Sequence, residues 1–143
     1  MARTLVVIIP HWRIIAAGVT HDHLAVVVNK DQVVDVTPAA AEHGIRLGIR
    51  RREAQKLCAD LKIIDDDEER NVRKFSSVVT ALESVTPRLE MTTGGWCSFP
   101  TRGPSRYFGG DQALARVVAE RTLKALSVTL KTTQVPSVIQ PLV

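Results

Sequence analysis

The sequence predicts an α/β or α+β fold in which strands and helices alternate around one sheet. Short apolar runs rich in β-branched residues occur at the start of the chain and again between residues 23 and 36, as expected of strands. Other segments carry apolar residues at helical spacing, most clearly over residues 72–85. A chain of 143 residues can bury one ordinary core, although two small lobes are also compatible with this length.

The first elements are predicted from apolar runs and from one polar turn. The opening run TLVVII is apolar after its first residue, as in a strand covered on both faces, and Pro10 ends it. The turn Asn29-Lys30-Asp31 joins two later apolar runs. The expected order is strand, helix, strand, strand, at residues 4–9, 11–19, 23–29 and 32–36.

Residues 38–60 are predicted to form a small helical insertion that is rich in alanine and arginine. Pro38 suits the first turn of a short helix, and Gly44 suits its end. A second short helix is expected over residues 51–58, because apolar residues there recur at i, i+3, i+4 and i+7. This apolar stripe consists of Ala54, Leu57, Cys58 and Leu61.

A long helix is predicted to follow a short strand at residues 62–64. The acidic run at residues 65–69 stands at its start, where the helix dipole stabilises negative charge. The helix is expected to face the core with Val72, Phe75, Val78, Val79, Leu82 and Val85.

The C-terminal part of the chain is predicted to contain one more strand and one more helix. The strand covers residues 88–93. The helix begins at Asp111 as its N-cap and extends to about Leu126. The apolar periodicity fades after Ser127, so residues 128–143 are expected to form an irregular or disordered tail.

The segment Gly94-Gly95-Trp96 interrupts the strand that precedes it. Two adjacent glycines weaken a strand and add no side chain to a sheet. The segment therefore predicts either a local bulge or a site whose original chemistry has been lost.

The chain carries a formal net charge of +4 and an isoelectric point of about 9.4. This mild basic excess permits contact with nucleic acid but does not require it. Cys58 and Cys97 have no paired spacing, and there is no signal peptide and no apolar run that could cross a bilayer. We therefore expect a cytoplasmic protein without membrane contact, with two reduced thiols.

The densest positive feature of the sequence lies in the helical insertion. It consists of Arg46, Arg50, Arg51, Arg52 and Lys56. Guanidinium groups bind phosphate oxygens through two parallel hydrogen bonds, so the group predicts phosphate contact. The alternative is a solvated helix face balanced by Glu42 and Glu53.

No pattern of a known catalytic or metal site is found in the sequence. His21 and His23 lack a convincing third ligand, which makes a surface turn the better interpretation than a zinc site. Nucleophile motifs and phosphate-binding loops are also missing. Carboxylates that could hold two metal ions do not cluster at the strand ends, so neither a metal nor another cofactor is predicted.

Residues 40–61, AAEHGIRLGIRRREAQKLCADL, resemble the fingers segment of Y-family DNA polymerases. The match is carried by Gly44-Ile45, Gly48-Ile49, Glu53-Ala54, Leu57-Cys58 and Leu61. The resemblance extends over about residues 3–126 and implies an α+β fold with a palm-like, ferredoxin-like mixed sheet. It implies a palm at residues 1–37 and 61–127, fingers at 38–60, and a tail at 128–143.

Active members of that family hold two magnesium ions with three carboxylates, one after the first strand and two on a later strand. In this sequence those positions are occupied by Pro10, Gly95 and Trp96. The positions of the tyrosine and arginine that handle the triphosphate correspond to Pro38 and Ala41. We therefore predict that the chain is not an enzyme and has no catalytic residues.

This combination of features is similar to the ImuB-type proteins, which are degenerate relatives of the Y-family polymerases. Their role implies an adaptor in damage-induced translesion synthesis and SOS mutagenesis. The implied partners are DNA, an error-prone replicative-type polymerase, a RecA-like accessory protein and the sliding clamp. Phosphate contacts are expected from the arginine group and from Arg102 and Arg106.

Two alternatives stay open. The chain is an active polymerase fragment if other acids such as Glu90 support nucleotide transfer, or it is a remnant without function. Family members are several times longer and carry further DNA-binding and clamp-binding parts, so a truncated form is expected.

Overall fold

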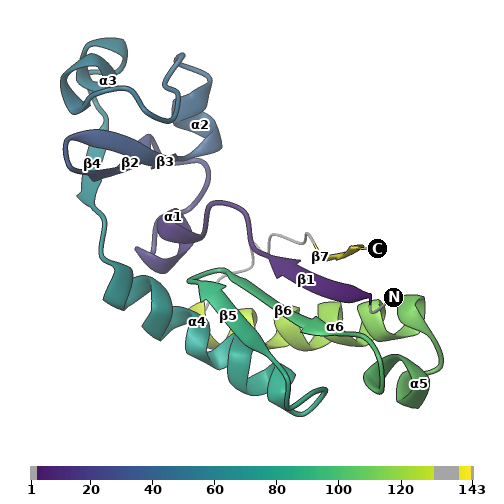
Figure 1. Cartoon of the computed structure of the whole chain (residues 1–143). Coiled ribbons are helices and arrows are strands. Elements are labelled where there is room, and N and C mark those ends of the chain that lie inside the picture. The colour runs from purple at the N-terminus through teal and green to yellow at the C-terminus, as the bar shows by residue number, and fades with distance from the viewer. Residues whose placement is uncertain (1–2, 131–138, 143) are drawn as a thin grey trace. The chain divides into compact units, whose positions relative to one another are not determined.

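The computed structural model describes residues 3–130 and 139–142. The chain forms two compact units: unit 1 comprises Met1–Pro10 and Val72–Val143, and unit 2 comprises His11–Asn71. Each has its own sheet, with helices packed beside it (Figure 1). The predicted α+β class is confirmed, whereas the single sheet is wrong.

Unit 1 is built on a four-stranded sheet with the order β5-β6-β1-β7, in which every pairing is antiparallel. Its strands are β1 (Thr4–Ile8), β5 (Glu90–Thr93), β6 (Trp96–Pro100) and β7 (Ile139–Leu142). Its helices are α4 (Glu68–Glu83), which begins in unit 2, α5 (Pro104–Phe108) and α6 (Asp111–Leu130). Strand β1 is therefore paired on both of its edges, with β6 on one side and β7 on the other.

The buried side chains of unit 1 follow the two predicted periodicities. On β1 and β6, Leu5 lies opposite Phe99 and Val7 lies opposite Cys97, and all four side chains are buried. The helices contribute Phe75, Val78 and Leu82 from α4 and Leu114, Val118 and Leu126 from α6, which are also buried. The predicted core face of the long helix is therefore confirmed at its central positions.

Unit 2 contains a three-stranded sheet with the order β3-β2-β4. Strand β2 (Ala25–Asn29) pairs antiparallel with β3 (Gln32–Val36) and parallel with β4 (Lys62–Asp65). The helices of the unit are α1 (Trp12–Ala16), α2 (Pro38–Ala41) and α3 (Arg51–Leu57). Lys30 and Asp31 have φ angles of 50° and 66°, as a tight two-residue hairpin turn requires.

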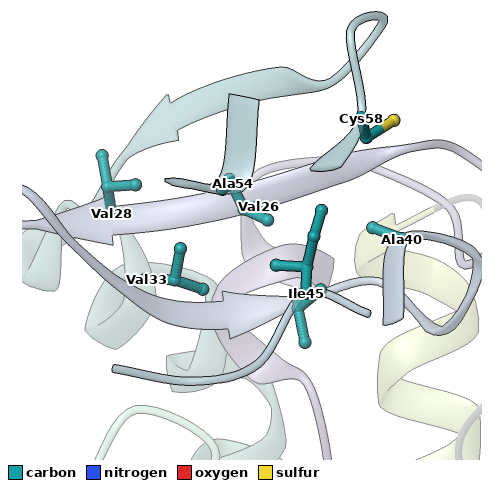
Figure 2. Close-up of a cluster of buried hydrophobic side chains, with 8 residues drawn as sticks. Val26, Val28, Val33, Ala40, Ile45, Ala54 and Cys58 are labelled. Atoms are coloured by element: carbon teal, nitrogen blue, oxygen red, sulfur yellow. The ribbon is translucent and has the colours of Figure 1, made fainter. Parts of the chain in front are cut away.

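Strand β2 is buried on both faces, which explains its continuous apolar sequence. Ala25 and Val27 pack with Ile14 and Val19 on one face. Val26 and Val28 point to the other face, into a second cluster (Figure 2). That cluster also contains Val33, Val36, Ala40, Ile45, Ala54 and Cys58. Because successive side chains of β2 point to opposite faces of the sheet, α1 packs on one face and the insertion packs on the other.

Buried polar groups fix the short helices of unit 2. The backbone N–H of Ile14 donates to Oδ2 of Asp35 over 3.2 Å, which satisfies a donor in the first turn of α1. Thr37 is the N-cap of α2: its hydroxyl oxygen accepts from the N–H of Ala40, and its O–H donates to the carbonyl oxygen of His23.

Three predictions about the C-terminal part need correction. Residues 96–100 form β6, and the glycine pair is the turn of the β5–β6 hairpin rather than the end of a broken strand; the pairing of the hairpin shifts register just before it, between Met91 and Thr93. Gly95 has a φ of 86°, which only glycine adopts readily. Helix α6 extends to Leu130, and residues 139–142 form β7, so these parts of the predicted tail are regular.

The boundaries predicted for the palm and the fingers, at residues 38 and 60, stay a prediction. The contacts within the chain divide it after Pro10 and after Asn71 instead. Among the described residues, no helix is long and apolar enough to cross a membrane.

Candidate nucleic-acid interface

The three positions at which the resemblance expects carboxylates lie at one end of the sheet of unit 1. Ile8 on β1 is opposite Trp96 on β6. One residue further, the N–H of Ile9 donates to the carbonyl oxygen of Gly95 over 2.9 Å. Pro10 follows directly, so the end of β1 and the turn of the β5–β6 hairpin meet here.

The side chains at these positions are apolar or absent. Trp96 is 43% exposed and lies opposite Ile8, which is 38% exposed. Proline, glycine and tryptophan offer no side-chain oxygen, and magnesium in proteins is held by oxygen ligands. Pro10, Gly95 and Trp96 therefore do not fit a magnesium ion held by carboxylates.

Glu90 is the acidic residue of the β5–β6 hairpin. It is exposed and lies opposite Ser98, two residues along β6 from Trp96, or about 7 Å at the usual rise of a strand. Among the described residues, no group of three or more histidine, cysteine, aspartate and glutamate side chains could hold a metal ion.

The arginines of the insertion are held in place by backbone bonds to β3. The N–H of Gly48 donates to the carbonyl oxygen of Val33, whose own N–H donates to the carbonyl oxygen of Ile49, each over 2.8 Å. The N–H of Arg51 donates to the carbonyl oxygen of Asp31 over 2.9 Å. Gly48 has a φ of 92°, so the glycine of the fingers pattern permits this approach to β3.

Buried residues beside these arginines hold the insertion to the sheet. Ile45, Ala54 and Cys58 face the cluster in Figure 2. The basic side chains stand between these buried residues in the sequence and lie outside the buried cluster. Arg46, Arg50, Arg52 and Lys56 are exposed, and Arg51 is partly exposed.

A hollow of about 600 Å³ in unit 2 is lined by Asp31, Arg50, Arg51, Arg52 and Gln55. It therefore brings three of the predicted phosphate-contacting arginines together, whereas Arg46 and Lys56 are not part of its lining. Nε of Arg51 is buried and has no acceptor within the described part of the chain. A buried N–H without an acceptor costs free energy, which a change in the position of this side chain could recover.

Arg51 also forms an ion pair with Asp65, and this pair is weak. Nη2 of Arg51 lies 3.2 Å from Oδ1 of Asp65, and the two side chains are 42% and 88% exposed. Exposed pairs of this kind contribute about 0–1 kcal/mol. Arg51 can therefore exchange Asp65 for a phosphate at little cost.

The two arginines predicted in the C-terminal part lie in unit 1, around Gly103. A hollow of about 500 Å³ is lined by Arg3, Thr101, Arg102, Gly103, Ser105, Arg106 and Asp111. A second one of about 360 Å³ is lined by Arg88, Arg102, Gly103 and Arg106. The two hollows adjoin each other, because Arg102, Gly103 and Arg106 line both of them.

Backbone bonds bring the segments around Gly103 together. The N–H of Thr101 donates to the carbonyl oxygen of Arg3 over 2.9 Å, which continues the pairing of β1 with β6. The N–H of Ser105 then donates to the carbonyl oxygen of Thr101 over 2.8 Å, and this turn leads into α5. Arg102 and Arg106, on either side of Gly103, consequently line the same two hollows.

Asp111 is the only acidic side chain among the residues that line these two hollows. Its Oδ1 accepts from the hydroxyl of Ser105, and its Oδ2 accepts from Nη1 of Arg3 over 2.7 Å. The Ser105 hydrogen bond, followed by that of Arg3, lowers the pKa of Asp111 below its ordinary value. The carboxylate therefore stays charged and neutralises Arg3.

Arg3 and Arg88 were not predicted from the sequence as phosphate-contacting residues. Arg3 is 98 residues from Thr101 in sequence, so no local pattern connects them. Arg3 could have been found by predicting a strand at residues 96–100. Pairing that strand with the first strand places Arg3 next to the segment that carries Arg102.

Comparison with known proteins identifies one family. The model of the impB/mucB/samB family matches residues 17–132. Among solved structures, one described as "Dbh Ternary Complex (substrates partially disordered)" matches with a TM-score of 0.69 at 12% identity. The match covers 85% of this chain and 38% of that chain, so the present chain spans well under half of its length. No curated protein sequence matches.

The structural match shows that the fold is similar to the palm and fingers region of a Y-family polymerase. The family match contradicts the prediction that the chain is not an enzyme, because this family points to Y-family DNA polymerases, which are nucleotidyltransferases. The prediction was wrong because it rested on single side chains, at Pro10, Gly95, Trp96, Pro38 and Ala41, whereas the family is recognised from the pattern of residues 17–132 as a whole.

Proposed function

The chain belongs to the impB/mucB/samB family, and from this membership we propose that it is a DNA-binding part of a Y-family polymerase-like protein that acts in translesion synthesis. Its primary role in this proposal is to hold DNA and to connect it with other proteins of the damage response. The observation that carries the proposal is the arginine-lined hollow of unit 2.

The chemistry of that hollow suits a nucleic-acid backbone. Arg50, Arg51 and Arg52 line it together with one acidic residue, Asp31. Phosphate contacts need positive charge and geometry, and they carry little sequence information. Binding through these residues is therefore expected to be independent of sequence and strongly dependent on salt.

The binding proposal is tested by titrating the chain into a fluorescent primer–template duplex at 50 mM and 200 mM NaCl and measuring anisotropy. We expect binding at the lower salt concentration that weakens steeply at the higher one. If no binding occurs even at 50 mM NaCl, the DNA-binding role is abandoned and the interpretation as a remnant without function takes its place.

The proposed protein partners rest on the similarity to ImuB-type proteins. They are an error-prone replicative-type polymerase, a RecA-like accessory protein and the sliding clamp. Analytical ultracentrifugation of the chain with each purified partner from the same organism tests them. A faster-sedimenting species with at least one partner supports the connecting role, and unchanged sedimentation with all three refutes it.

Nucleotide transfer is the second candidate function, and the family match favours it. Because Pro10, Gly95 and Trp96 lack carboxylates, other acids have to take part, and Glu90 is the acid nearest to them on the hairpin. Primer extension with Mg²⁺ and deoxynucleotides is expected to be lost in Glu90→Ala. The matched control is Glu83→Ala on α4, which is also exposed. Absence of extension in the unmodified chain removes this candidate.

A further inference from the structure

Four arginines from separate segments of unit 1 gather around Gly103, and we propose that the two hollows they line form one binding site for closely spaced phosphate groups. The arginines are Arg3, Arg88, Arg102 and Arg106. The phosphates come either from a nucleic-acid strand, a source that rests on the proposed function, or from a free oligophosphate.

The charges around these hollows are unbalanced. Asp111 forms an ion pair with Arg3, at 2.7 Å. Within the described part of the chain, Arg88, Arg102 and Arg106 form no ion pair, and all three are exposed. Three neighbouring positive charges repel one another, and an anion placed among them removes that repulsion.

The arrangement favours an anion with more than one phosphate group. Arg102 and Arg106 line both hollows, Arg88 lines only the smaller one and Arg3 only the larger one. Neither hollow is therefore lined by all four arginines. An occupant with several phosphates can extend across both, where each guanidinium can donate two parallel hydrogen bonds.

The Arg3–Asp111 pair predicts the order of importance of the four arginines. Because Asp111 already neutralises Arg3, a phosphate there has to compete with a carboxylate that also accepts from Ser105. Arg88, Arg102 and Arg106 face no such competitor. We infer that these three provide most of the affinity and that Arg3 contributes less.

The site is tested with tripolyphosphate and orthophosphate by isothermal titration calorimetry on the full chain, at low salt. A fluorescent single-stranded oligonucleotide is titrated in parallel by anisotropy. The variants are Arg88→Ala and the double change Arg102→Ala with Arg106→Ala. Arg116→Ala is the control, because Arg116 is an exposed arginine of the same unit that lines neither hollow. Circular dichroism melting checks that each variant folds.

Tripolyphosphate is expected to bind more tightly than orthophosphate. The double variant should weaken it by roughly tenfold or more, and Arg116→Ala by less than about twofold. Arg106→Lys keeps the positive charge but loses the planar guanidinium group that donates two parallel hydrogen bonds, so it should also weaken binding. If oligonucleotide affinity falls in the same variants, the phosphates are those of a nucleic acid; if only tripolyphosphate affinity falls, a free oligophosphate is the occupant.

The inference is overturned if neither ligand is weakened in the double variant, or if Arg116→Ala weakens both ligands equally. If oligonucleotide binding depends only on Arg50, Arg51 and Arg52, the proposed function stands, but a nucleic acid is excluded as the ligand of the site around Gly103. If neither the single-stranded oligonucleotide nor the primer–template duplex is bound, while tripolyphosphate still binds through the four arginines, the proposed function is refuted and this site stands.

Discussion

Replacing Arg50, Arg51 and Arg52 together by alanine is the most direct test of the hollow in unit 2. The fold should tolerate the change. Arg50 and Arg52 are exposed, and the bonds that hold this segment to β3 come from the backbone. The one ion pair that is lost, Arg51 with Asp65, is largely exposed and contributes about 0–1 kcal/mol. Alanine also has the highest intrinsic helix propensity, which favours α3.

The expected effect on DNA binding follows from counterion release. Each phosphate contact to duplex DNA adds about −0.9 to the slope of log K against log salt. If all three arginines that line the hollow contact phosphates, their removal should make the slope less negative by about 2.7. Over a fourfold rise in salt, from 50 to 200 mM, the unmodified chain should therefore lose about 40-fold more affinity than the variant.

The assay is fluorescence anisotropy with a labelled primer–template duplex at several NaCl concentrations. The control is a second triple variant, Arg73→Ala, Arg116→Ala and Lys124→Ala, which removes the same charge from exposed positions on α4 and α6. An unchanged slope in the hollow variant would refute the assignment. An equal change in the control would show that net charge, rather than this hollow, determines binding.

Three further predictions concern buried groups. Burial raises the pKa of Cys97 to about 12, so iodoacetamide at pH 8 should modify this thiol only in the unfolded chain. Because the folded chain favours the protonated thiol, its contribution to the free energy of unfolding is complete below the ordinary pKa of 9.0 and is lost as the pH rises through 12. Thr37→Val should lower the free energy of unfolding by about 1–3 kcal/mol in urea titrations, because it leaves the N–H of Ala40 without its cap. Asp35→Ala should cost about as much by leaving the N–H of Ile14 unpaired, whereas Asp35→Asn keeps an acceptor and should cost less; equal costs would contradict this account.

The amino-acid sequence by itself determined the local elements of this protein. The apolar run of β1, the doubly buried β2 and the amphipathic α4 each depend on side-chain spacing within a few residues, and each lies near its predicted position. The arginines of the insertion were also predicted as a group, because they are close in sequence. Local spacing is enough wherever the relevant residues belong to one element.

The tertiary structure decided everything that depends on pairing between distant segments. From the sequence, Gly94 and Gly95 are predicted to interrupt a strand, and only the pairing of β6 with both β5 and β1 makes them a hairpin turn. The same pairing joins Arg3 to Thr101, so that Arg3 and Arg102 line one hollow, and the strands form two separate sheets. Strand register and sheet membership depend on which edges are free once the chain has folded, and that information is not present in any short stretch of sequence.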